Sequence, residues 1–381
     1  MSERLITCND DLYAAYARRV PKVFHDYVAA GSWTEHTLRK NRWDLEEICL
    51  RQRVGVDIST RSTTAKILGE DVAMPLALSP VGMLGMQWAD GEIKAAQAAE
   101  AFGVPFTLST MSICSIENVA DHTTRPFWFQ LYVMRDMGFT RALMARARDA
   151  GCTTLVVTLD LTVQGQRHRD LKNGMSVPPR LSLANLANMA MCWRWGLGML
   201  GTRRRTFGNL VGHVKGLDDM SLVVDWVNKN FDPPVNWSKL QQIREEWDGK
   251  LVLKGVLDPL DAEQAIAIGA DAIIVSNHGG RQLDGAPSTI RALPKIADTV
   301  AGRCEVLVDS GIRSGQDVLR ARALGADAAM IGRAFVYGLG AQGSRGVTKA
   351  LNMIQKELDL TMAFCGVTSN DQIDRGNLWT G

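Results

Sequence analysis

The sequence has almost no net charge and no apolar run at its start. Its 43 lysines and arginines nearly balance 41 acidic residues, which gives a formal net charge of +2. Nucleic-acid-binding domains concentrate basic residues on one face, so we expect no nucleic-acid partner. The first eleven residues carry charges of both signs and no apolar stretch, unlike a secretory signal, and we therefore expect a cytoplasmic protein.

Paired cysteines and a dinucleotide fingerprint are also lacking. The seven cysteines are scattered, and none has the spacing of a zinc site or a redox pair, so we expect reduced thiols and no metal site. No Gly-x-Gly-x-x-Gly motif follows the first predicted strand, which disfavours a dinucleotide-binding fold.

What the chain does contain is a regular alternation of segments. From residue 71, short apolar runs alternate with longer amphipathic ones, which predicts parallel strands linked by helices. The predicted strands are 75–79, 106–109, 127–131, 154–159, 251–254, 272–276, 305–309 and 328–331, and helices are predicted at 91–102, 138–150, 259–268, 294–300 and 314–324. Eight such units favour a (β/α)₈ TIM barrel, with a doubly wound open sheet as the alternative.

Two segments lie outside this repeat. We expect a single domain over 1–381, with barrel segments 71–175 and 218–360, a helical N-terminal extension at 1–70 over the barrel mouth, and an insertion at 176–217. Within the insertion, residues 181–205 mix apolar, aromatic and basic side chains and include no acidic one. This composition suits an active-site lid, a subunit contact or a membrane interface, and the sequence leaves all three open.

Polar residues gather where the predicted strands end, which in a TIM barrel is the catalytic face. They are Gln130, Tyr132, Thr158, Asp160, Lys254, Ser276, His278, Arg281, Asp309 and Arg333. His278 can serve as a general base, Arg281 can pair with a carboxylate, and Asp160 can orient the imidazole. Lys254 is a cation at a buried position, which needs an anionic partner; a Schiff-base role is the competing interpretation.

Glycine-rich loops follow the last two predicted strands. They are Asp309-Ser310-Gly311-Ile312-Arg313 and Gly332-Arg333. Backbone N–H groups beside glycine can approach an anion, and each arginine can bind two phosphate oxygens. We therefore expect a phosphorylated cofactor or substrate between strands seven and eight.

Several motifs together resemble one enzyme family across almost the whole chain. They are Phe129-Gln130-Leu131-Tyr132, Lys254-Gly255, Ser276-Asn277-His278-Gly279-Gly280-Arg281-Gln282-Leu283-Asp284 and the two phosphate loops. These motifs resemble the FMN-dependent L-2-hydroxy-acid dehydrogenases and oxidases. Within that family, the resemblance is strongest to the respiratory L-lactate dehydrogenases of bacteria, through residues 78–82, 106–110 and 230–233.

The resemblance implies a role for each matching residue. FMN would be held by Pro80, Val81, Gly82, Ser109, Gln130, Thr158, Lys254 and Ser276, and by the phosphate loops Asp309, Ser310, Gly311, Ile312, Arg313, Gly332 and Arg333. The substrate would be bound by Tyr27, Tyr132, Arg167 and Arg281, and Lys254 would stabilise the reduced flavin. His278, supported by Asp160, would take a substrate proton while two electrons pass to the flavin.

Two positions bear on the substrate and the electron acceptor. Met111 stands where glycolate oxidase has a tryptophan, and Gly82 stands where the oxidases usually have alanine. The resemblance therefore favours oxidation of a small 2-hydroxy acid, L-lactate to pyruvate, by a homotetramer that passes electrons to a quinone and attaches to the cytoplasmic face of the inner membrane. The alternatives are a hydrogen-peroxide-producing oxidase, a mandelate- or glycolate-type dehydrogenase and a flavin-free sugar-phosphate barrel.

Overall fold

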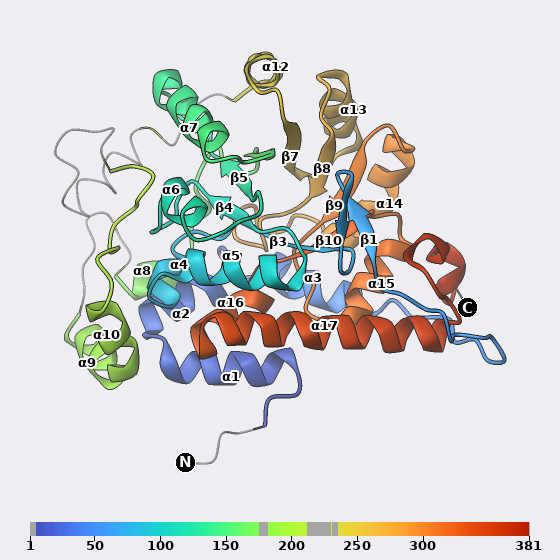
Figure 1. Cartoon of the computed structure of the whole chain (residues 1–381), viewed down its shortest axis with the longest axis horizontal. Helices are drawn as coiled ribbons and strands as arrows, with labels where there is room; N and C mark the ends of the chain where they lie inside the picture. Colours follow the sequence, from blue (N-terminus) through green and yellow to red (C-terminus); the bar gives the residue numbers. More distant parts are fainter. Residues whose placement is uncertain (1–4, 175–181, 212–229, 231–234, 381) are drawn as a thin grey trace.

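The structure, a computed structural model, describes residues 5–174, 182–211, 230 and 235–380 (Figure 1). Its centre is a sheet of eight parallel strands: β3 (Leu76–Leu78), β4 (Thr107–Ser109), β5 (Trp128–Leu131), β6 (Thr154–Thr158), β7 (Lys250–Val256), β8 (Ala272–Val275), β9 (Glu305–Val308) and β10 (Ala328–Ile331). The strand order is β3-β10-β9-β8-β7-β6-β5-β4, and a parallel bridge between Leu78 and Phe106 joins the two edges. The predicted (β/α)₈ barrel is confirmed.

Helices follow the strands and surround the barrel (Figure 1). They are α5 (Gly91–Phe102), α6 (Ile116–Ala120), α7 (Met137–Asp149), α12 (Trp237–Glu246), α13 (Pro259–Ala267), α14 (Thr289–Val300), α15 (Gly315–Ala323), α16 (Arg333–Gln342) and α17 (Ser344–Cys365), and the 3₁₀ turns η1 (Asn370–Gln372) and η2 (Arg375–Asn377) come last. Four of the five predicted helices agree within one residue at each end. The expected barrel boundary at 360 falls inside α17.

The remaining predicted helix, at 294–300, was predicted to start too late. We expected it to start at Pro294, but α14 begins at Thr289 and contains the proline. Proline inside a helix removes one backbone hydrogen bond and costs about 3 kcal/mol. Burial of Ile290, Leu293 and Ile296 on one helical face offsets that cost, because each of the three is almost completely enclosed.

Alternate residues of the strands face opposite sides of the barrel wall. In β8, Ala272 and Ile274 pack inside the barrel, whereas Ile273 and Val275 belong to the layer beneath the helices. Both sets are fully buried, which explains why the strands read as continuous apolar runs.

The N-terminal extension contains helices, as expected, and it ends in a short β-hairpin that was not predicted. It contains α1 (Asn9–Arg19), α2 (Lys22–Ala29) and α3 (His36–Glu46), and then the hairpin β1 (Ala65–Ile67) and β2 (Glu70–Val72). Ile67 and Val72 pack with the inward-facing barrel residues. The hairpin therefore fills the end of the barrel opposite the catalytic face, and α2 brings Tyr27 to the cavity at the mouth.

The insertion is described in part. It contains α9 (Leu183–Met191) and α10 (Trp193–Leu200), which lie beside α8 (His168–Lys172), α2 and α4 (Leu84–Gln87) (Figure 1). The predicted insertion residues 176–181 and 212–217 lie outside the described residues. In the described part of the chain, no helix combines the length and apolar character needed to cross a membrane.

Candidate active site

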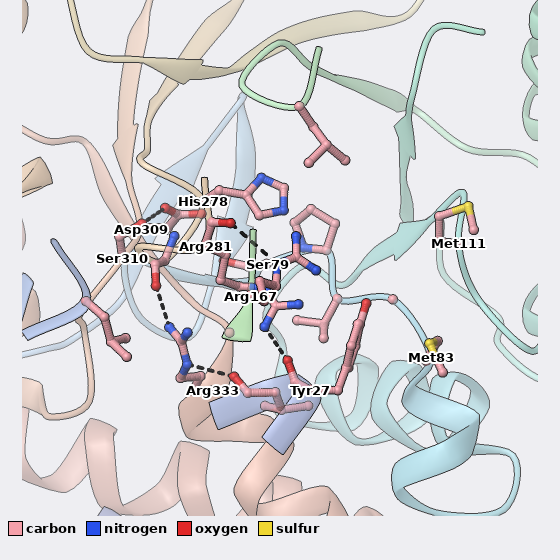
Figure 2. Close-up of a pocket in the computed structure, with 18 of the residues that line it drawn as sticks. Tyr27, Ser79, Met83, Met111, Arg167, His278, Arg281, Asp309, Ser310 and Arg333 are labelled. Carbon is pink, nitrogen blue, oxygen red and sulfur yellow. Dashed lines mark hydrogen bonds between the residues drawn. The ribbon is translucent and has the colours of Figure 1, made fainter. Parts of the chain in front are cut away.

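A cavity of about 750 Å³ opens at the carboxyl ends of the strands. Its wall includes His278, Lys254 and residues of the loops after β9 and β10. Figure 2 shows Tyr27, Arg167, Arg281 and His278 around one space, with Asp309, Ser310 and Arg333 at one end. Its volume is within the range of cofactor and substrate pockets.

The predicted base, His278, lies in an unusual backbone conformation. Its φ is +57°, in the left-handed region, and Gly279 and Gly280 follow with φ of +68° and +72°. A side chain on Gly280 would come within 2.5 Å of the Leu38 nitrogen, so the turn needs glycine. Left-handed conformation at a non-glycine residue is costly and is concentrated at functional sites.

Asp160 orients the imidazole of His278, and burial keeps that imidazole neutral. Its Nδ1 lies 2.8 Å from Asp160 Oδ1, and a carboxylate can only accept, so Nδ1 carries the hydrogen and Nε2 keeps a free lone pair. Burial lowers the pKa of His278, although Asp160 opposes this. Burial raises the pKa of Asp160, but attraction to Lys254 and His278 outweighs burial and leaves it below its usual value. The pair is therefore poised to accept a proton.

Lys254 has anionic partners within the protein. Its ammonium nitrogen donates to Ser276 Oγ at 2.8 Å and lies 3.7 Å from Asp160 and 3.6 Å from Asp309. Burial lowers the pKa of Lys254, but the two carboxylates outweigh it and raise the pKa above its ordinary value. A Schiff-base lysine needs a depressed pKa, so this environment disfavours that alternative.

The four residues predicted to bind the substrate all line the cavity. The Arg281 guanidinium lies 4.7 Å from the centre of the Tyr27 ring and donates to the Tyr27 carbonyl. Arg167 donates to Gln282 Oε1 at 3.4 Å, and burial lowers its pKa to about 10, so it stays charged at neutral pH. Burial raises the pKa of Tyr132 well above its usual range, which keeps its hydroxyl a donor. Two cations and neutral hydroxyls can together bind a carboxylate and an adjacent oxygen.

The phosphate loops lie together at the other end of the cavity. Asp309, Ser310, Gly311, Ile312, Arg313, Gly332 and Arg333 are all on the wall. Arg333 donates to the main-chain oxygens of Gly279, Val28 and Ala30, which fixes its guanidinium beside the His278 turn. Because a guanidinium has five N–H donors, this arrangement leaves capacity for phosphate oxygens.

Not every predicted cofactor residue reaches the cavity wall. Pro80, Val81, Gly82 and Lys254 do, whereas Ser109, Gln130, Thr158 and Ser276 lie buried at the strand ends behind it. Asp160 is likewise behind the wall and acts on the cavity through His278.

The buried polar atoms at the strand ends fit a flavin. Gln130 Nε2, Thr158 Oγ1 and Ser79 Oγ are buried, and each lacks a hydrogen-bond partner in the described structure. Unpaired buried polar atoms are costly, so a polar ligand is expected there. FMN combines a phosphate with a ring that carries several hydrogen-bonding atoms. The buried polar atoms without partners match the ring, and the glycine-arginine loops match the phosphate.

The wall residues missing from the predicted site include the polar Ser79 and Asp170. Ser79 directly follows β3 and could have been found by the strand-end rule that identified Gln130 and Thr158. Asp170 is buried on the wall, 3.8 Å from Arg167, and burial raises its pKa. Its position three residues after Arg167 is a weak sequence signal, because such spacing is common on helices.

Known proteins that are similar to this chain include FMN-dependent dehydrogenases and L-lactate dehydrogenases. A family model described as FMN-dependent dehydrogenase matches residues 16–380. The chain is 49% identical to an L-lactate dehydrogenase of Alcaligenes faecalis over 374 residues, covering 97% of each chain. It is 47% identical to that of Vibrio cholerae serotype O1 over 375 residues, covering 98% of this chain and 99% of the relative.

Solved structures with the same architecture include two mandelate enzymes. The monotopic membrane protein (S)-mandelate dehydrogenase superposes with a TM-score of 0.94 at 34% identity, covering all of both chains. A mandelate oxidase superposes with a TM-score of 0.83 at 36% identity, covering 96% of each.

Proposed function

The chain belongs to the FMN-dependent dehydrogenase family, and from that membership we propose that it oxidises L-lactate to pyruvate and passes the electrons to a quinone. It is an FMN-dependent L-2-hydroxy-acid dehydrogenase. Lactate is favoured as the substrate because the L-lactate dehydrogenases share 47 to 49% identity with it, against 34 to 36% for the mandelate enzymes.

One observation carries the proposed chemistry. The cavity brings the neutral His278, backed by Asp160, to the same space as Arg167 and Arg281. A base beside a carboxylate anchor is what removal of a proton from a 2-hydroxy acid requires.

Each of these residues has a separate role in the proposed reaction. Arg281 and Arg167 bind the substrate carboxylate and fix its orientation, and Tyr132 donates to the oxygen on the reacting carbon. His278 Nε2 accepts a proton from the substrate, and Asp160 stabilises the imidazolium that results. FMN, when bound, supplies the two-electron oxidant. Lys254, held by Asp160 and Asp309, provides a fixed positive charge at the strand ends where negative charge develops.

A peripheral position at the cytoplasmic face of the inner membrane is part of the proposal. Leu183, Leu186, Trp193 and Leu200 of α9 and α10 are exposed, and arginines follow at 203–205. Apolar and basic residues on one exposed segment suit an anionic lipid surface. The similar (S)-mandelate dehydrogenase is described as a monotopic membrane protein, which supports this reading.

The proposal is tested by a substrate screen without oxygen. L-lactate should bleach the flavin absorbance faster than glycolate or (S)-mandelate at equal concentration. Mixing the reduced enzyme with air-saturated buffer should reoxidise it slowly, whereas a short-chain quinone should reoxidise it fast. Rapid reoxidation by air would support the oxidase alternative instead.

A further inference from the structure

The cavity has an apolar side that offers no hydrogen-bonding side chain to the reaction at His278. Six residues form it: Phe24, Met83, Met86, Met111, Met189 and Phe207, which we call the methionine arm. Figure 2 shows Met83 and Met111 beyond Tyr27, on the side away from Asp309, Ser310 and Arg333. The phosphate loops and the methionine arm therefore occupy opposite sides of the cavity.

The methionine arm is one continuous surface built from several segments. The Met83 nitrogen donates to the Met111 carbonyl at 2.9 Å, and the nitrogen of Gly208, next to Phe207, donates to the carbonyl of Ser112 at 3.2 Å. Trp195 of α10 donates to the Met86 carbonyl at 2.8 Å, and its ring centre lies 5.4 Å from that of Phe24. The insertion therefore supplies part of the cavity wall.

The side chains of the arm suit a different ligand from a small hydroxy acid. Methionine and phenylalanine side chains offer no N–H or O–H donor, so they cannot help to bind a carboxylate. Flexible methionines adapt to a large apolar or aromatic surface. The Tyr27 hydroxyl lies at the inner end of the arm, 3.0 Å from where a side chain on Gly82 would begin, and can donate to a ligand oxygen.

The outer end of the arm lies beside the exposed apolar segment. Met189 lines the cavity, whereas Met191, on the same helix α9, is 73% exposed. The backbone nitrogen of Lys22 donates to Asn188 Oδ1 at 2.7 Å, which fixes α9 against α2 next to the arm. A molecule dissolved in lipid beneath α9 and α10 would thus reach the arm over a short distance.

We propose that the methionine arm binds the ring of a membrane quinone. This inference rests on the proposed function, because it locates the site of the proposed acceptor. In each turnover, L-lactate loses two electrons and two protons and becomes pyruvate, and the quinone gains two electrons and two protons and becomes the quinol. Once pyruvate has left, Tyr27 donates a hydrogen bond to one quinone oxygen, and the methionines enclose the ring.

The test compares Met189→Gln with Met191→Gln in the FMN-loaded enzyme, using a short-chain, water-soluble quinone without membrane or detergent. Met189→Gln should raise the KM for the quinone by about tenfold, because it places an amide against the ring. It should leave the KM for lactate and anaerobic flavin bleaching unchanged. Met191→Gln should change neither. Met189→Ala, which removes the contact without adding polarity, should raise the quinone KM by a smaller factor.

Quinone binding can also be measured without turnover. The quinone should quench tryptophan fluorescence, and Trp195→Phe should remove part of that quenching, because Trp195 lies against the arm. An unchanged quinone KM and unchanged quenching in both Met189 variants would overturn the proposal. A raised KM for (S)-mandelate with an unchanged quinone KM would also overturn it and would assign the arm to a substrate side chain.

Failure of the proposed function would give a different experimental result from failure of the quinone site. In that case L-lactate would not bleach the flavin of the unaltered enzyme, whereas quinone quenching and its loss in Met189→Gln would still support the arm as a quinone site.

Discussion

At the scale of single residues, the site depends on the neutral imidazole of His278. We expect His278→Gln to lower kcat by at least about 100-fold, because the glutamine amide cannot accept a proton. The variant should still bind FMN, since the phosphate loops and the strand ends are unchanged. Flavin absorbance and steady-state kinetics measure both quantities, and normal turnover would remove His278 from the role of base.

Burial and Asp160 act in opposite directions on the pKa of His278 and together set the pH range in which it acts as a base. Because burial lowers the pKa of His278, kcat/KM should fall only when the pH drops below about 6.5, the ordinary range of histidine. Asp160 opposes this lowering, so Asp160→Asn should move the acidic limb to still lower pH and reduce the plateau rate. A pH profile of kcat/KM measures the limb, and a shift to higher pH would contradict the pairing.

Arg281 should anchor the substrate carboxylate. Arg281→Met should lower kcat/KM for lactate by about 10- to 100-fold, the effect of losing a charge-assisted hydrogen bond. Arg303→Met is the matched control, because Arg303 pairs with Glu263 on the surface away from the cavity. Equal kinetics in the two variants would show that the carboxylate binds elsewhere.

The sequence predicted most of the polar side chains on the cavity wall, because strand ends can be located from apolar runs and the ends of parallel strands meet. It could not predict how far each side chain extends. Gln130 and Thr158 therefore lie behind the wall, while Ser79 and Asp170 lie on it. The methionine arm was not predicted, because it joins residues from distant segments that share no spacing.

At the scale of elements, α9 and α10 should attach the protein to membranes. Deleting residues 183–205 would also remove Met189 and Trp195 from the site, so surface substitution is the cleaner test. Leu197→Gln with Leu200→Gln should reduce binding to anionic vesicles several-fold, because both leucines are at least 60% exposed. Leu260→Gln with Leu360→Gln is the control, on exposed leucines of α13 and α17. Equal vesicle sedimentation of both double variants would refute the interface.

The elements differ in how well the sequence predicts them. The barrel strands were predicted because both of their faces are buried, which leaves continuous apolar runs. The hairpin of β1 and β2 was missed, because three-residue strands are too short for a periodic signal. Its place in the fold depends on Ile67 and Val72 packing inside a barrel formed by later segments.

At the scale of the whole molecule, the barrel closes because β3 and β4 meet through Leu78 and Phe106. Counting eight strand-helix units predicted this closure, since an open sheet would leave two unpaired edges. The homotetramer stays a prediction, because subunit contacts depend on surfaces that no spacing along one chain encodes. The insertion contributes both to the cavity and to the molecular surface, because Met189 lines the cavity and Met191 is exposed.

Oxidation of a 2-hydroxy acid in this cavity should depend on His278. The most direct measurement is anaerobic stopped-flow absorbance of the FMN-loaded enzyme mixed with L-lactate, alongside His278→Gln. We expect rapid bleaching of the flavin bands in the unaltered enzyme and bleaching at least about 100-fold slower in the variant. Equal bleaching rates in the two proteins, or no bleaching by L-lactate in either, would contradict the role of His278 as the base.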